Sequence, residues 1–217
     1  MAIATDAAAK SFTNSGSSLT YSHTCTGSNL YLLVGVWVGG GNTISGVTYN
    51  GVAMTQLGTA NASNSRKPYL FGLANPATGA NNVVVSASGT TLIYAVSESY
   101  TGTSSTQPDG TANTGNVTNQ ASITGTVTVT QNNCWLVMFV NSGTDDALGS
   151  GSAGAGTTLR IQGDSNSSLY DSNGTVSTGA QSLVATLTGG NTDDMGQVTI
   201  SLAPFVESST GFMHISV

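Results

Sequence analysis

Two stretches of this chain, 104 residues apart, carry the same alternation of apolar and hydroxyl side chains. Residues 18–29 align without a gap on residues 122–133, and in both stretches Ser and Thr alternate with apolar residues. A period of two places successive side chains on opposite faces of a strand, one of them buried. The match continues into two nearly all-apolar segments, 30–36 and 134–140. The pattern therefore predicts strands, arranged in two similar halves.

The later part of each half repeats as well. Residues 79–89 match residues 179–189 at an offset of 100, and the strands that follow, 92–100 and 196–202, return to an offset of 104. Further short strand candidates lie between these anchors, separated by turns such as Asn50-Gly51.

We predict an all-β protein, a β-sandwich of jelly-roll or related Greek-key type with about twelve short strands. Its two pseudo-repeated halves span about residues 16–102 and 120–203. The halves could interleave in one sandwich or form two small sandwiches in tandem. We favour one sandwich domain over residues 1–204, because the join between the halves is short and each half is poor in large apolar residues.

The composition excludes several functional classes. Only 6% of the 217 residues are charged, against roughly 25% in an average domain, which argues against helical bundles and coiled coils. Four Lys and Arg against ten Asp and Glu leave no basic footprint for a nucleic acid. No apolar run approaches the roughly 18 residues of a membrane span. We expect neither nucleic acid nor membrane as a partner.

The N-terminal residues and the cysteines bear on the cellular setting. Residues 1–10 lack the basic and apolar regions of a secretory signal, so we expect synthesis in a cytoplasm without export by that route. The Gly-, Ser-, Thr- and Asn-rich composition is nevertheless typical of extracellular proteins. Cys25 and Cys134 could form one bridge, but a chain of this length does not need it, and we favour free buried thiols.

Residues that could carry chemistry are few. His23 occupies the inward face of its strand and is expected in the core, and His214 has no partner in the pattern. Glu98 is the one acid within a clear strand, and a single carboxylate makes a weak site. The acidic pairs 145–146 and 193–194 could bind Ca²⁺, but we favour solvated turns. We expect no catalytic residue, no metal site and no cofactor.

A single basic cluster is the candidate for ligand contact. Arg66, Lys67 and Tyr69 could touch an anionic neighbour or a glycan. Positive charge beside Pro68 could equally protect an edge strand from unwanted pairing. The sequence leaves the two interpretations open.

Segments 30–38 and 134–140 are hydrophobic on both faces, whereas a two-layer sandwich covers only one. We expect the second face to be covered by a long loop, by the chain ends or by another subunit. Because so few charges would keep copies apart, we favour assembly. The candidate interface residues on these segments are Tyr31, Leu33, Trp37, Trp135 and Phe139.

The C-terminal residues 205–217 are predicted to form an apolar tail or docking arm, because Pro204 should end the last strand and the final residues are apolar. This arm could cover the chain's own strand face or add a strand to a neighbour's sheet, and we favour the neighbour. Its candidate contact residues are Phe212, Met213, Ile215 and Val217.

The segment Ile44-Ser-Gly-Val-Thr-Tyr-Asn-Gly-Val-Ala-Met-Thr-Gln-Leu-Gly58, with the hairpin 18–38 and the strand 95–102, resembles a widespread all-β module. Such modules occur in bacterial surface proteins and in structural proteins of tailed-phage virions. The resemblance covers most of residues 11–204. It implies a sandwich fold and an extracellular or virion setting, and it brings no catalytic residues.

Phage structural proteins are made inside a cell without a signal peptide and then work outside it, which fits both observations on the cellular setting. We therefore expect a non-enzymatic structural protein of a tailed-phage virion, a capsid decoration or head-surface protein. Its partners would be neighbouring capsid or tail subunits and further copies of itself. The alternative is a carbohydrate-binding or adhesin sandwich on a virion or cell surface, with a surface glycan as partner.

Overall fold

The structure is a computed structural model that describes residues 1–62, 66–143, 148, 156–164 and 166–207. The described part holds fourteen strands, one short 3₁₀ turn η1 (Thr188–Gly190) and no α-helix. All strand pairs are antiparallel. The predicted all-β sandwich class is confirmed.

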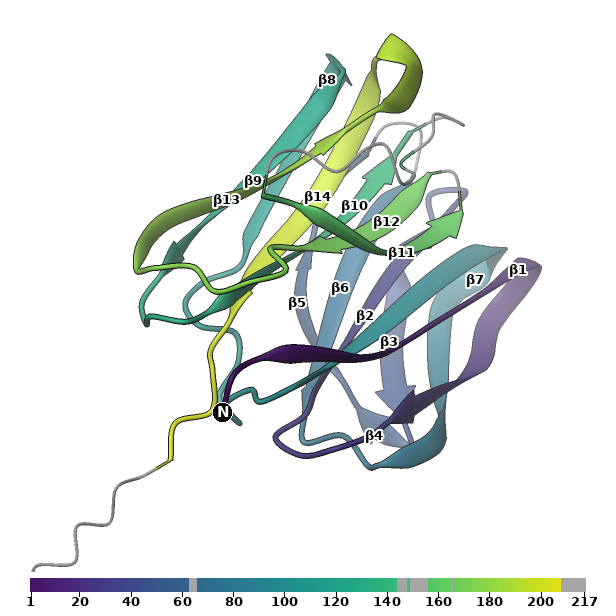
Figure 1. Ribbon diagram of the computed structural model, residues 1–217. Helices are drawn as coiled ribbons and strands as arrows, with labels where there is room; N and C mark the ends of the chain where they lie inside the picture. Colours follow the sequence, from purple (N-terminus) through teal and green to yellow (C-terminus); the bar gives the residue numbers. More distant parts are fainter. Residues whose placement is uncertain (63–65, 144–147, 149–155, 165, 208–217) are drawn as a thin grey trace, which may run out of the picture.

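Seven strands come from each half of the chain. The strands of the first half are β1 (Ala4–Cys25), β2 (Tyr31–Val38), β3 (Ile44–Tyr49), β4 (Val52–Ala53), β5 (Thr55–Thr59), β6 (Lys67–Ala74) and β7 (Gly79–Thr101). Those of the second half are β8 (Asn113–Gln120), β9 (Ser122–Val129), β10 (Trp135–Ser142), β11 (Thr158–Asp164), β12 (Ser167–Asp171), β13 (Gly179–Thr186) and β14 (Asp193–Leu202). Figure 1 shows β1 to β7 gathered on one side and β8 to β14 on the other.

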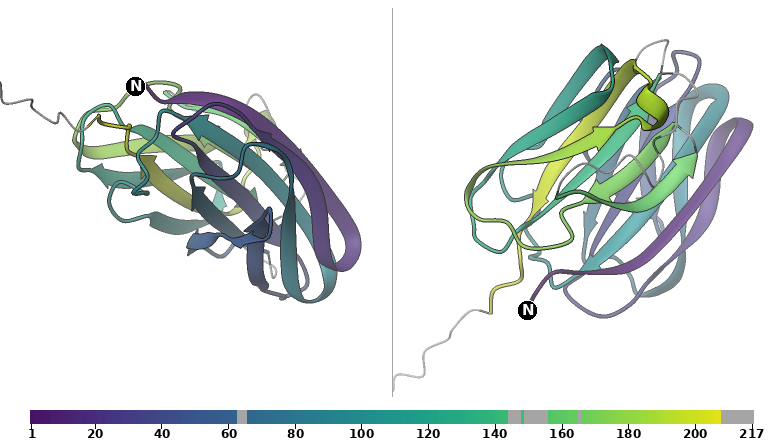
Figure 2. Two further views of the ribbon diagram at one scale, coloured as in Figure 1. Left: turned by 90° about the horizontal axis from the view of Figure 1, so that it is seen from below. Right: turned by 45° about the horizontal axis from the view of Figure 1, so that its top comes forward.

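In the first half, the long strands β1 and β7 run side by side through two layers, as both views of Figure 2 show. The early part of β1 pairs with the late part of β7, and register shifts between Thr13 and Ser18 separate it from the second pairing region. Bulges of this kind bend a strand pair. Beyond them, β3 and β4 extend the outer layer, whereas β2, β6 and β5 extend the inner layer.

The second half has a five-stranded inner sheet, β11-β12-β10-β14-β8, and a two-stranded outer sheet, β13-β9. Its outer pair has a register equivalent to that of the first half. Leu19 lies opposite Val85, and the residues 104 and 100 positions later, Ile123 and Ala185, also lie opposite each other. The doubling of the fold stays a prediction, since β3 and β4 have no counterpart among the described strands of the second half.

The last strands depart from the predicted offset. Tyr31 pairs with Tyr100, and Trp135 pairs with Leu202, so the equivalent positions are 102 residues apart rather than 104. The difference arises between β13 and β14, where the first half instead continues through β7 as one strand.

The preferred interleaved arrangement is not what the structure shows, because every named strand pairs within its own half. Each half fills the space between its own inner and outer layers with one hydrophobic cluster. A third cluster, which we call the seam, joins the two inner sheets face to face. The seam consists of Ile3, Tyr31, Leu33, Leu70, Val96 and Tyr100 from the first half and Trp135, Val137, Phe139, Leu169, Val198, Ile200 and Leu202 from the second.

The seam explains why β2 and β10 are apolar on both faces. The even-numbered apolar residues of both strands belong to the cluster of their own half, whereas Tyr31 and Leu33 of β2 and Trp135, Val137 and Phe139 of β10 belong to the seam. At Gly35 a Cβ atom would lie 2.4 Å from the ring of Phe139, so only glycine lets this ring pack against β2.

The expectation that another subunit covers these faces is therefore wrong for Tyr31, Leu33, Trp135 and Phe139, since the other half of the same chain covers them. Tyr31, Leu33 and Phe139 are at most 3% exposed, and Trp135 is 9% exposed, all within the seam. Trp37 is also buried, at 2% exposed. The four tail residues Phe212, Met213, Ile215 and Val217 lie outside the described residues, so the docking arm stays a prediction.

Candidate functional site

A cluster of ionisable side chains crosses the seam between the two halves. Glu98 and Tyr100 lie on β7, and Asp171 ends β12. The Tyr100 hydroxyl donates to Asp171 Oδ2 at 3.1 Å, and Arg160 Nε on β11 donates to the same oxygen at 2.6 Å. Arg160 Nη2 also donates to Asn173 Oδ1 at 2.5 Å. One carboxylate thus holds a tyrosine of the first half and an arginine of the second.

Glu98 stands out in this cluster because its charge is poorly compensated. It is 4% exposed, and its Oε2 atom has no hydrogen-bond partner among the described residues. Burial raises the pKa of Glu98 to about 8, although the nearby Arg160 guanidinium acts in the opposite direction. The carboxyl group is therefore neutral in the folded protein below that pH.

Arg160 has the opposite balance of effects. Burial is the largest single effect and lowers its pKa, but the hydrogen bond to Asp171 and the negative charges of its acidic neighbours together outweigh burial, and the pKa is raised overall. Its guanidinium also lies 5.8 Å from the centre of the Trp135 ring. Because Asp171 is fully buried and Glu98 almost so, this cluster offers a substrate no access and acts to hold the seam together.

A second polar network surrounds His23. Its Nε2 lies 3.1 Å from Ser99 Oγ and its Nδ1 lies 2.9 Å from Ser97 Oγ. Ser99 Oγ also donates to Asp6 Oδ2 at 2.7 Å. With the ring 1% exposed, burial lowers the pKa of His23 to about 4. The prediction of a satisfied core histidine is confirmed.

The order of groups in this network differs from that of a hydrolase. In a catalytic triad the carboxylate orients the histidine, and the histidine activates the serine. Here the carboxylate of Asp6 contacts Ser99 instead, and both histidine nitrogens are occupied by serines. The arrangement can order the first core but cannot present an activated nucleophile to solvent.

In each half, one carboxylate binds the residue that directly follows a strand, β1 in the first half and β9 in the second. Asp6 accepts hydrogen bonds from the backbone N–H and hydroxyl of Thr26, and Asp109 accepts them from the same groups of Thr130. Burial is the largest single effect on each carboxyl group, but all the hydrogen bonds that the group accepts together outweigh it and lower the pKa of both. Both carboxylates therefore stabilise the backbone at the end of a strand.

The cysteines are free and buried, as predicted. Cys25 lies in the cluster of the first half and Cys134 in that of the second. Burial raises the pKa of Cys25, and burial followed by the charge of Asp109 raises that of Cys134 to about 12. Neither thiol is poised to react.

The structure does not bring the predicted ligand contacts Arg66, Lys67 and Tyr69 onto one surface. Tyr69 is 5% exposed and packs in the cluster of the first half, so its role as a surface contact is wrong. Alternation along β6 is the reason, because it turns Tyr69 toward that cluster. Lys67 is partly buried, and the Arg66 guanidinium lies 4.9 Å from the centre of the Trp37 ring.

Trp37 and Arg66 belong to a row of stacked groups that sequence reasoning missed. The Tyr94 ring lies 5.0 Å from that of Trp37 on one side and 5.1 Å from that of Phe12 on the other. Phe12, Tyr94 and Trp37 occupy paired positions on β1, β7 and β2. The feature of the sequence that could have indicated this row is Phe12 itself, which is one aromatic residue in the polar stretch 10–14.

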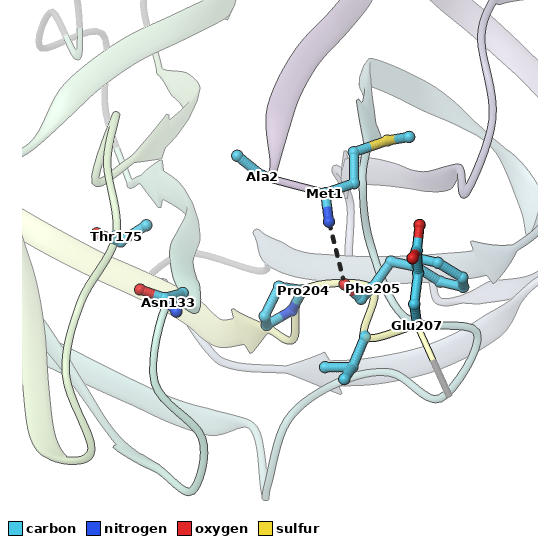
Figure 3. A pocket seen from close by; sticks show the side chains of 8 residues that line it. Met1, Ala2, Asn133, Thr175, Pro204, Phe205 and Glu207 are labelled. Carbon is cyan, nitrogen blue, oxygen red and sulfur yellow. Dashed lines mark hydrogen bonds between the residues drawn. The ribbon is translucent and has the colours of Figure 1, made fainter. Parts of the chain in front are cut away.

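A hollow of about 590 Å³ lies where Met1 and Phe205 meet, and Figure 3 shows its lining. The terminal ammonium of Met1 donates to the Phe205 carbonyl at 3.5 Å. Glu207 is the one carboxylate among the lining residues, which otherwise offer apolar side chains and the polar Asn133 and Thr175.

Within the described ranges, no three His, Cys, Asp or Glu residues gather where a metal ion could bind. The same part of the chain contains no helix that is long and apolar enough to span a membrane. Comparison with protein-family models, with curated proteins and with solved structures gave no match for this chain.

Proposed function

We propose that the protein is a non-enzymatic structural protein of a tailed-phage virion, a capsid decoration or head-surface protein that binds neighbouring capsid or tail subunits. The observation that carries this proposal is the enclosure of its reactive groups. His23, Glu98 and Asp171 are each at most 4% exposed, so their chemistry serves the interior rather than a substrate.

The packing of the two halves supports a role that depends on shape. Three hydrophobic clusters run in succession through the molecule, one inside each half and one between them. Each layer is thus fixed by its neighbours, and a dense interior of this kind transmits strain rather than yielding to it. A rigid body with few charged groups suits a protein that bridges fixed neighbouring subunits.

Purified virions test the proposal directly. We expect quantitative mass spectrometry of gradient-purified particles to find the chain at a fixed ratio to the major capsid protein. Added purified protein should bind particles that lack it and saturate at that same ratio. Absence from purified particles, or binding that never saturates, would contradict the proposal.

A further inference from the structure

The row Phe12–Tyr94–Trp37–Arg66 is a fixed platform that ends at an exposed ring. Its interplanar angles are 13° between Phe12 and Tyr94 and 12° between Tyr94 and Trp37. The guanidinium of Arg66 closes the far end of the row over Trp37. Stacked rings on paired strands hold one another in place, so Phe12 is oriented before anything binds to it.

Phe12 is left uncovered at the near end of the row. Among the described strands, its strand β1 pairs with β7 alone and therefore forms an edge of the inner layer. The Phe12 side chain is 55% exposed, while Trp37 in the same row is 2% exposed. An exposed aromatic ring loses the stabilisation of burial, so the core of the protein does not account for a phenylalanine here.

A hollow of about 480 Å³ opens beside this ring, lined by Lys10, Ser11, Phe12, Tyr94 and Gly163. It lies between the two halves, because Gly163 belongs to β11. A Cβ atom at Gly163 would lie 2.6 Å from Ser167 Oγ and 3.0 Å from the side chain of Val96. Ser167 of the same half and Val96 of the other half thus leave little room for a side chain at this position of the wall.

Lys10 supplies the polar side of the hollow. Its ammonium group donates to the Gln162 carbonyl at 2.8 Å, which ties β1 to β11. An ammonium group has three N–H donors, and the bond to Gln162 uses one of them. The lining residues include no carboxylate, so a ligand that offers hydroxyl or other oxygen acceptors meets donors rather than competing acids.

We propose that this hollow binds a saccharide, with the apolar C–H face of one sugar ring on Phe12 and its oxygens toward Lys10. The volume lies within the roughly 300–1,000 Å³ of small-ligand sites, which combine aromatic walls with a few polar groups. A nucleic acid would also stack on a ring, but a chain with a net charge of −6 repels its phosphates. The site goes beyond the structural role proposed above and does not depend on it.

The experiment uses the full chain, two alanine variants matched for exposure and the conservative variant Phe12→Tyr. Phe12→Ala removes the ring, and Val52→Ala removes an equally exposed apolar side chain, 53% exposed, on β4. An array of immobilised neutral and acidic saccharides identifies a binder, and calorimetric titration with that free saccharide measures its affinity. We expect saturable binding that Phe12→Ala weakens at least tenfold, that Val52→Ala leaves unchanged and that Phe12→Tyr retains.

Melting temperatures show whether a variant loses binding merely because it is less stable. Both alanine variants alter exposed side chains and should melt within a few degrees of the parent protein, so a tenfold loss in Phe12→Ala alone would locate the site. If the array shows no saccharide above background, or if Phe12→Ala binds as tightly as the parent, the saccharide site does not exist. Equal losses in Phe12→Ala and Val52→Ala would overturn it as well.

Discussion

At Glu98, burial and a nearby positive charge act in opposite directions on one carboxyl group, and burial prevails. At His23, burial favours the neutral ring. Both side chains are therefore neutral in the folded protein at pH 7. Their effects on stability have opposite signs, because a raised acid pKa disfavours folding at high pH and a lowered histidine pKa disfavours it at low pH.

The first prediction concerns the pH dependence of Glu98→Gln. The folded pKa of about 8 exceeds the usual 4.5, so the stabilisation from the protonated group is complete below pH 4.5 and is lost as pH rises to about 8. His23 opposes this loss below pH 6.5 but not above it. We expect Glu98→Gln to be the more stable protein at pH 8.5, by at least about 1 kcal/mol.

Urea unfolding of both proteins at pH 6.5 and pH 8.5 measures this effect. The parent protein should lose stability between the two pH values, while Glu98→Gln should change much less. Equal losses in the two proteins would show that Glu98 is ionised in the fold at neutral pH.

The second prediction concerns His23 directly. Because its folded pKa is about 4, its imidazole resonances in NMR spectra should not titrate between pH 8 and pH 5.5. Free histidine in the same buffer serves as the control, with a midpoint near its usual value of about 6.5. A His23 midpoint close to that of free histidine would contradict the buried, doubly bonded ring.

At the scale of the strands, the contact between β2 and β10 depends on one missing side chain. The ring of Phe139 on β10 occupies the space that a Cβ atom of Gly35 would need. The two inner sheets approach each other at this point, so any added atom must displace the ring or separate the sheets.

The third prediction is that Gly35→Ala destabilises the protein by about 1–3 kcal/mol, the usual range for an overpacked core. Gly46→Ala on β3 is the matched control, since a Cβ atom there would meet nothing within 4 Å. Phe139→Leu should recover part of the loss when combined with Gly35→Ala. Equal stabilities of the Gly35→Ala and Gly46→Ala variants in urea unfolding would show that the sheets do not meet at Gly35.

At the scale of the whole molecule, each half covers the apolar face that the other would otherwise expose. The seam therefore removes the reason for expecting the strand faces to drive self-association. Any association of copies would have to use other surfaces, and the predicted arm at residues 205–217 is the remaining candidate.

The fourth prediction compares the full chain with a chain that ends at Glu207. The shortened chain should be a monomer by light scattering, because its inner faces are covered within the molecule. If the arm joins copies, the full chain should be larger while the two melting temperatures agree. An oligomeric shortened chain would contradict this prediction, because its copies would associate without the arm and without an uncovered face of β2 or β10.

The sequence by itself determined the strands. A period of two is a local property, because successive side chains of a strand point to opposite faces whatever lies beyond them. It placed Leu19 and Ile123 correctly on buried faces and His23 in the core. It also established that β2 and β10 are covered on both sides, since neither face could remain in water.

Only the tertiary structure decided what covers them. The apolar side chains of Tyr31 and Phe139 show that some other surface must cover them. Hydrophobic burial is non-directional, however, so it does not identify which surface that is. For the same reason, the sequence could not predict which groups lie near Glu98, because Asp171 and Arg160 lie on strands of the other half. Nor could the sequence predict the row of stacked groups at Phe12, because the row forms only when β1, β7 and β2 pair in register.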